Sequence, residues 1–195
     1  MWEQWKHPDN QRSAGSIEID RAAGLVKKTY GLSSVETAKP WLSDSTEEDC
    51  TRFFENDVRW LRAMADAGAD FVPRLVDVDE PSRSYVIPYL GDDLLIGHVI
   101  PRRTADLSRI GFREQVISHF MLYRELGIYK YNHAAINHCI VGSRVMVIDF
   151  KWTSARIGGE RHRSLVDPAY AERYAVENWM VKMDPTLPEA LLPLI

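Results

Sequence analysis

The sequence predicts an α+β protein in which a strand-rich N-terminal part precedes a mostly helical C-terminal part. Three observations predict this: short β-type runs flank a first amphipathic helix, a second amphipathic helix follows, and an apolar hairpin lies beyond it. Hydrophobic residues make up 45% of the 195 residues, which is enough apolar material for a core.

The composition also excludes several classes of protein. A formal net charge of −4 argues against a general binder of nucleic acid or anionic membranes. No run approaches the roughly 18 apolar residues of a membrane span, and the first residues contain no signal-peptide core. Only Cys50 and Cys139 are present, so we expect no disulfide framework and a cytoplasmic location.

The N-terminal part should begin with two strands and a helix. Ser16–Asp20 and Gly24–Tyr30 have β-type composition and are separated by a short turn. Ser45, followed three residues later by Glu48, fits a capping box at the start of a helix. Gly68 is a plausible stop for it. Apolar residues recur between them at helical spacing, namely Phe54, Val58, Leu61, Met64 and Ala65.

Further elements follow in a clear order. Phe71–Val78 and Ser84–Leu90 are predicted strands on either side of a turn that contains Pro81. The amphipathic pattern of residues 112–126 predicts a second long helix that ends at a glycine, and residues 168–183 predict a third helix.

The apolar runs His138–Val141 and Arg144–Ile148 predict a hairpin, because Gly142-Ser143 between them suits a type II′ turn. That turn fixes the register, with Val141 opposite Arg144, Cys139 opposite Met146 and Asn137 opposite Ile148. Asn137 and Asp149 are then diagonal neighbours at the open end of the hairpin. Their oxygens could bind one hard cation such as Mg²⁺. The alternative is a solvated hairpin, since both residue types are common at strand ends.

The hairpin and the segment before it resemble the protein kinase-like superfamily. Val147-Ile148-Asp149-Phe150-Lys151 is similar to the metal-binding D-F-G of that family, with Lys151 in place of Gly. In the family's H-R-D-x-x-x-x-N pattern the Asn lies five residues after the Asp, and counting back from Asn137 reaches Asn132.

Upstream segments extend the resemblance in the right order. Leu25-Val26-Lys27 is similar to the third-strand motif whose Lys holds the α- and β-phosphates, and Lys28 is the alternative after a slip of one residue. The resemblance implies that the acidic partner on the next helix is Asp57, with Glu55 as the fallback.

The run Ser84–Gly91 resembles the hinge that pairs with adenine. Pro88 lacks an N–H, so a neighbour, Tyr89 or Leu90, would supply the donor.

The resemblance implies a small two-lobed protein kinase-like fold with a truncated helical C-terminal lobe. Residues 1–90 would form the β-rich lobe with one helix, and residues 91–195 the mostly helical lobe that carries the metal and phosphate hairpin. It also implies ATP and Mg²⁺ as cofactors, Asn137 and Asp149 as metal ligands, and a protein or small-molecule phosphoacceptor. A family Gly-rich phosphate loop is missing, and Ser13–Ser16 is its poorest substitute.

Catalysis is the open question. The family's catalytic Asp receives or orients the proton of the substrate hydroxyl, whereas Asn132 cannot act as a base. His133 is adjacent and is a candidate replacement. Two hypotheses follow: a phosphotransferase with a degenerate catalytic loop, and a catalytically inactive pseudokinase that acts as a binding or scaffold module. In the second, the Lys151 ammonium could take the metal position.

Two other patterns favour less specific explanations. His133, His138 and Cys139 could suggest zinc, but their spacing matches no closed tetrahedral site. The basic run Arg161-His162-Arg163 could contact an acidic partner, although charge runs usually face water.

Overall fold

The structure is a computed structural model, and it describes residues 1–5, 15–31, 46–95, 104–130, 137–151, 153–155 and 186–191. The chain is of mixed α+β type, and every strand pairing among these residues is antiparallel. It divides into two compact units. Unit 1 comprises residues 1–68, 72–90 and 150–152, and unit 2 comprises residues 69–71, 91–149 and 153–195.

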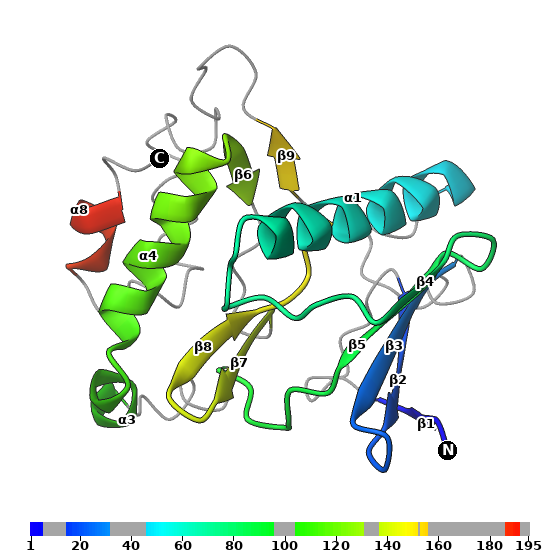
Figure 1. Cartoon of the computed structure of the whole chain (residues 1–195), viewed down its shortest axis with the longest axis horizontal. Helices are drawn as coiled ribbons and strands as arrows, with labels where there is room; N and C mark the ends of the chain where they lie inside the picture. The colour runs from blue at the N-terminus through cyan, green and yellow to red at the C-terminus, as the bar shows by residue number, and fades with distance from the viewer. Residues whose placement is uncertain are drawn as a thin grey trace. The chain divides into compact units, whose positions relative to one another are not determined.

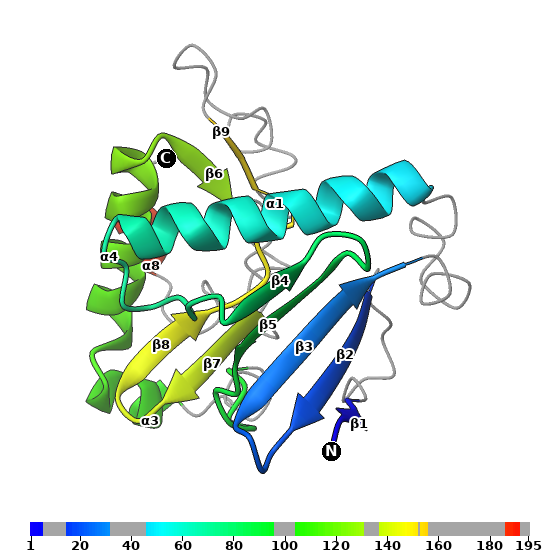
Figure 2. The same ribbon diagram turned by 45° about the vertical axis from the view of Figure 1, so that its right-hand side comes forward.

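Unit 1 is built on a five-stranded sheet with the order β1-β2-β3-β5-β4 (Figures 1 and 2). The strands are β1 (Glu3–Gln4), β2 (Gly15–Asp20), β3 (Leu25–Tyr30), β4 (Asp77–Asp79) and β5 (Ser84–Pro88). The helix α1 (Glu47–Asp66) lies along one face of this sheet in both views. Ring contact between Tyr30 on β3 and Phe53 on α1, with centroids 6.4 Å apart, holds the two layers together.

The start of α1 differs by one residue from the sequence prediction. Thr46, not Ser45, is the N-cap: its hydroxyl accepts from the Asp49 N–H at 3.1 Å, and the Asp49 carboxylate accepts from the Thr46 N–H at 2.9 Å. Asp49 therefore replaces Glu48 in the capping box, because the box joins the N-cap to the residue three positions later. The predicted stop is confirmed, since Gly68 follows the C-cap with φ +78°.

The predicted strand Phe71–Val78 is wrong over most of its length. Only Asp77–Asp79 pairs with β5 as a strand. Pro73 has no N–H to donate, and the Phe71 carbonyl accepts instead from the Val147 N–H at 2.7 Å. The backbone of Phe71 is thus used by a different partner inside unit 2.

Unit 2 contains the predicted second long helix and hairpin. The helix α4 (Phe112–Glu125) ends at Gly127 with φ +62°. In the hairpin of β7 (His138–Val141) and β8 (Arg144–Val147), Val141 lies opposite Arg144 and Cys139 opposite Met146, so the predicted register is confirmed. Gly142 has φ +61°, as the turn requires.

Four further elements of unit 2 were not predicted. They are α3 (Thr104–Arg109), the strand pair of β6 (Ile128–Lys130) with β9 (Thr153–Ala155), and α8 (Leu187–Leu191). The predicted helix of residues 168–183 lies outside the described residues.

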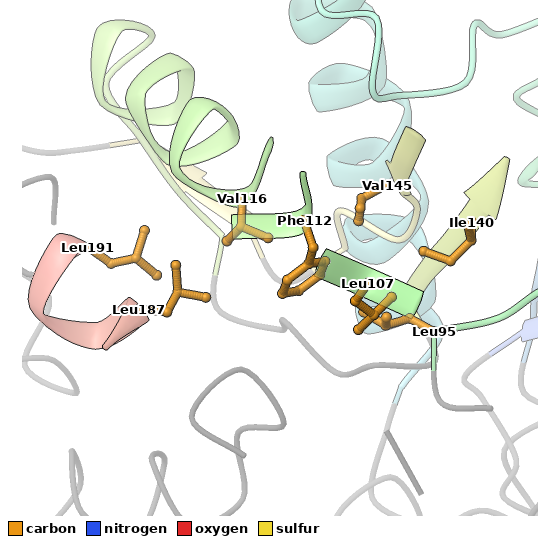
Figure 3. Close-up of a cluster of buried hydrophobic side chains, with 8 residues drawn as sticks. All are labelled: Leu95, Leu107, Phe112, Val116, Ile140, Val145, Leu187 and Leu191. Atoms are coloured by element: carbon orange, nitrogen blue, oxygen red, sulfur yellow. The ribbon is translucent and has the colours of Figure 1, made fainter. Parts of the chain in front are cut away.

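The core of unit 2 gathers side chains from α3, α4, α8 and the hairpin, together with Leu95 (Figure 3). Its buried members are Leu95, Leu107, Phe112, Val116, Ile140, Val145, Leu187 and Leu191. This core fixes the β7–β8 hairpin on α4. Gln115 of α4 also holds the hairpin: its side-chain amide donates to the Ser143 carbonyl and accepts from the Val145 N–H, both at 2.8 Å. None of the helices in the described ranges has the length and apolarity that crossing a bilayer demands.

Candidate functional site

Asp57 is the centre of the polar cluster inside unit 1. It lies on the sheet-facing side of α1, and its side chain is completely buried. Four donors reach its carboxylate: the Lys28 ammonium and the Tyr85 hydroxyl at 2.8 Å each, the Tyr30 hydroxyl, and the Phe150 N–H. A carboxylate buried without such donors would be strongly unfavourable, and these four hydrogen bonds offset the cost of burying Asp57. Glu55, the fallback, is exposed.

Lys28, not Lys27, makes the ion pair with Asp57. Successive side chains of a strand point to opposite faces, so only one of two adjacent lysines on β3 can face α1. Lys28 is 7% exposed and its ammonium lies 2.8 Å from the Asp57 carboxylate. Lys27 is half-buried on the other face, where its charge helps to lower the pKa of Asp79 after the larger effects of hydrogen bonds from Ser82. The first choice from the sequence was therefore off by one residue for this pairing.

Two tyrosines complete the Asp57 cluster. Tyr30 lies two residues after Lys28 on the same face of β3, and Tyr85 on β5 is paired directly opposite Lys28. Both rings are buried, and the Lys28 ammonium lies 4.9 Å from the centroid of the Tyr30 ring and 6.0 Å from that of Tyr85. The rings therefore stabilise the cation as well as donating to the carboxylate.

The segment after Asp149 is tied to α1 within unit 1. The Phe150 N–H donates to Asp57, and the Asn56 amide donates to the Lys151 carbonyl at 3.0 Å. Phe150 is fully buried and Lys151 is 8% exposed. Asp57, which pairs with Lys28, therefore also binds the backbone N–H of Phe150, directly after Asp149.

Asn137 and Asp149 lie at the open end of the hairpin in unit 2. The Ile148 N–H donates to the Asn137 carbonyl at 2.9 Å, which extends the hairpin by one residue pair. Asp149 follows directly after this last pair. Asp149 has φ +68°, a left-handed conformation that is uncommon outside glycine, although Asp is among the residues that adopt it more often. Such backbone outliers are concentrated at functional sites.

The Asn137 side chain is 7% exposed, and within the described ranges its amide nitrogen has no hydrogen-bond partner. A buried polar atom in this condition is unfavourable, and a bound water or ligand is one way to satisfy it. The two ends of an amide are nearly isosteric, so a half-turn of the side chain presents the oxygen instead. Asn137 and Asp149 together supply the hard oxygen ligands that suit Mg²⁺.

Lys130 is a second buried cation, in unit 2. It is 6% exposed at the end of β6, and its ammonium donates to the Asp149 carbonyl at 2.6 Å. Sequence analysis missed it, although it lies two residues before Asn132 in the segment that resembles the catalytic loop.

The hinge-like run offers one backbone donor rather than two. The Tyr89 N–H donates to the Gly24 carbonyl at 2.8 Å, so it is used within unit 1. No hydrogen bond from the Leu90 N–H is found over the ranges the structure covers. Of the two candidates left open by the sequence, Leu90 is the one with a donor to offer.

The remaining sequence candidates fall into two groups. Asn132, His133 and the basic run of residues 161–163 lie outside the described residues. His138 and Cys139 are buried, and burial raises the pKa of the Cys139 thiol to about 12, with the nearby charge of Asp93 adding to the effect. A neutral thiol is a poor zinc ligand, and the described residues contain no group of three or more His, Cys, Asp or Glu that could hold a metal.

The chain matches no family model and no curated protein.

The two tyrosines of the Asp57 cluster were not predicted, although the position of Tyr30 relative to Lys28 was a visible signal. Because side chains alternate along a strand, Lys28 and Tyr30 lie on one face of β3. Two polar side chains on a buried face indicate a buried polar group that binds them. Lys130 had only a weak signal, because its partner is a backbone carbonyl 19 residues away.

Proposed function

We propose that this chain is a protein kinase-like ATP- and Mg²⁺-binding protein with a small two-lobed fold. The observation that carries the proposal is the buried ion pair of Lys28 on the third strand with Asp57 on the following helix. In protein kinases a lysine of the third strand pairs with an acidic residue of the next helix, and the lysine orients the nucleotide phosphates. A buried ion pair rarely adds stability over an apolar pair, which favours a functional reason for it.

Each residue of the proposal has a chemical task. In this proposal the Lys28 ammonium, which carries three N–H donors, donates to phosphate oxygens. The Leu90 N–H would pair with the adenine edge. Asn137 and Asp149 would hold Mg²⁺, which neutralises charge on the phosphates when it is bound.

The binding claim is tested by a thermal-shift titration of ATP with and without Mg²⁺. The wild-type protein should be stabilised in a concentration-dependent way, and Lys28→Met should weaken ATP binding by about 10- to 100-fold, the value of one or two charge-assisted hydrogen bonds. Lys27→Met is the matched variant and should bind ATP as the wild type does. An ATP response that is absent from the wild type, or that is lost with Lys27 instead of Lys28, would contradict the assignment.

Whether the bound nucleotide is turned over depends on the residue that replaces the family's base. A positioned base typically contributes about 10²–10⁴-fold, so Asn132 predicts slow or absent phosphoryl transfer to a protein or small-molecule acceptor. Positioning and electrostatic stabilisation could still act through Lys28 and Asp149. The alternative is a pseudokinase that binds nucleotide as part of a scaffold.

The two alternatives are separated by measuring γ-phosphate turnover for the wild type and Asp149→Ala. A rate that falls with Asp149→Ala supports the phosphotransferase. Identical traces, at the background rate, favour the pseudokinase.

A further inference from the structure

Lys130 is buried in unit 2, where an ammonium group needs strong partners to be tolerated. It ends β6, which pairs with β9 in a register that places Lys130 opposite Thr153. Its side chain reaches to the Asp149 carbonyl, with 2.6 Å between the ammonium nitrogen and the oxygen. A charge-assisted bond of this length is among the stronger contacts that a carbonyl can receive.

Asp149 is in a backbone conformation that needs such a hold. Among the described non-glycine residues, only Arg83 and Asp149 have positive φ, at +49° and +68°. The left-handed conformation is unfavourable by about 1–2 kcal/mol for most L-residues; Asp tolerates it better, and contacts to the backbone then help to select it. The carbonyl that Lys130 holds belongs to this residue, and the preceding residue is fixed by the bond from the Ile148 N–H to the Asn137 carbonyl.

We propose that Lys130 is a positioning residue that holds Asp149 in its left-handed conformation and thereby aims the Asp149 carboxylate for Mg²⁺. The inference rests on the proposed function for the identity of the ion. Its structural half, the control of the Asp149 backbone, stands on the hydrogen bond and the φ angle alone. Lys130 acts through the carbonyl of Asp149 and does not itself contact the nucleotide.

The structural half is tested by hydrogen exchange of the protein without ligand. Lys130→Met removes the donor, and we expect at least tenfold faster exchange of the Phe150 amide, which follows Asp149 directly and donates to Asp57. Exchange in α1 and α4 should stay as in the wild type. Arg144→Met is the control, because Arg144 is an exposed cation of the same unit that pairs with Asp70 at 3.2 Å. Unchanged protection at Phe150 would overturn the proposal, as would an equal rise throughout the protein.

The functional half is tested by the same variants in ATP titrations with and without Mg²⁺. Lys130→Met should bind ATP without Mg²⁺ as the wild type does. The increase in ATP affinity on adding Mg²⁺ should be at least tenfold smaller than in the wild type, and Lys130→Arg should restore most of that increase. Full retention of the Mg²⁺ effect in Lys130→Met overturns the positioning role. Absence of any ATP binding in the wild type defeats the proposed function instead, and exchange at Phe150 then still decides the structural half.

Lys130→Gln covers the case in which Lys130→Met does not fold. The Gln amide retains an N–H donor without the charge, so the Phe150 amide should exchange faster than in the wild type and Lys130→Arg, but by less than tenfold. A Lys130→Gln protein with wild-type protection and a full Mg²⁺ effect would show that the charge is not needed and would overturn the charge-assisted role of the lysine.

Discussion

The two units bury polar groups in opposite ways. In unit 1 the Asp57 carboxylate is fully enclosed and accepts from four donors, with its partner cation also buried. In unit 2 the Asn137 amide nitrogen is buried without a partner in the ranges the structure describes, and Asp149 carries a left-handed backbone. A satisfied network makes a rigid framework, whereas an unsatisfied group at a backbone outlier is the kind of place a ligand completes.

This difference assigns separate tasks to the two sets of residues. The Asp57 cluster fixes where Lys28 and the Phe150 backbone lie before any ligand arrives, which is the preorganisation that tight phosphate binding needs. In the proposed function, Asn137 and Asp149 are the residues that would hold the ion. Mutations in the first set should therefore act on stability, with Lys28→Met also weakening ATP binding, and mutations in the second should act on Mg²⁺-dependent binding.

Removing Asp57 should have the largest effect on stability. Asp57→Ala leaves the Lys28 ammonium and the other donors buried without their acceptor, so we expect a loss of about 3–5 kcal/mol in the free energy of unfolding. Urea denaturation measures it, with Glu55→Ala on the exposed side of the same helix as the control, expected within about 0.5 kcal/mol of the wild type. A loss below 1 kcal/mol for Asp57→Ala would contradict the picture of a closed, charged cluster.

Acid should destabilise unit 2 through His119. Burial lowers the pKa of this imidazole from 6.5 to about 3, and its ring stacks on Phe71 with centroids 3.9 Å apart. The unfolded chain binds a proton below pH 6.5 while the folded protein does not until about pH 3, so stability is lost as the pH falls through this window. Between pH 6.5 and 5.0 the loss is at most about 2 kcal/mol, since the slope is at most about 1.4 kcal/mol per pH unit.

The check is urea denaturation at both pH values for the wild type, His119→Phe and Ser118→His. His119→Phe keeps a ring against Phe71 and should lose most of the pH dependence. Ser118→His places an imidazole at an exposed position of the same helix and should behave as the wild type does. Equal pH dependence in His119→Phe and the wild type would show that other groups cause the acid effect.

The tyrosine hydroxyls should contribute less than the charge that they surround. Tyr85→Phe and Tyr30→Phe each remove one hydrogen bond to Asp57 and keep the ring, so each should lower the free energy of unfolding by about 1–2 kcal/mol. The two losses should be non-additive, because both hydroxyls share one carboxylate oxygen. Strict additivity in a double-mutant cycle would argue against a shared network.

Asn137 should show the smallest effect on stability and a clear one on binding. Asn137→Leu replaces a partly unsatisfied buried amide with an apolar group, so the free energy of unfolding should change by less than about 1 kcal/mol in either direction. The Mg²⁺-dependent part of ATP binding should be lost. A large destabilisation with unchanged Mg²⁺ dependence would reverse the contrast between the two units.

Local patterns in the sequence were enough to predict α1, α4 and the hairpin register. Helical spacing and the glycine stops are short-range signals, and a two-residue turn leaves the hairpin one register. The phase of β3 was harder, because Leu25-Val26-Lys27-Lys28 can present either lysine to a partner until Tyr30 and Tyr85 are known to share the buried face. The β6–β9 pairing and the bond from Lys130 to Asp149 join segments far apart in the sequence, where no local pattern indicates a partner.

The most direct test of the central claim is a crystal structure with a non-hydrolysable ATP analogue and Mg²⁺. The account predicts phosphate oxygens within hydrogen-bonding distance of the Lys28 ammonium, adenine paired with the Leu90 N–H, and the ion bound by Asn137 and Asp149. At saturating analogue, phosphates that make no contact with Lys28, or an ion that is not bound by Asn137 and Asp149, would contradict it.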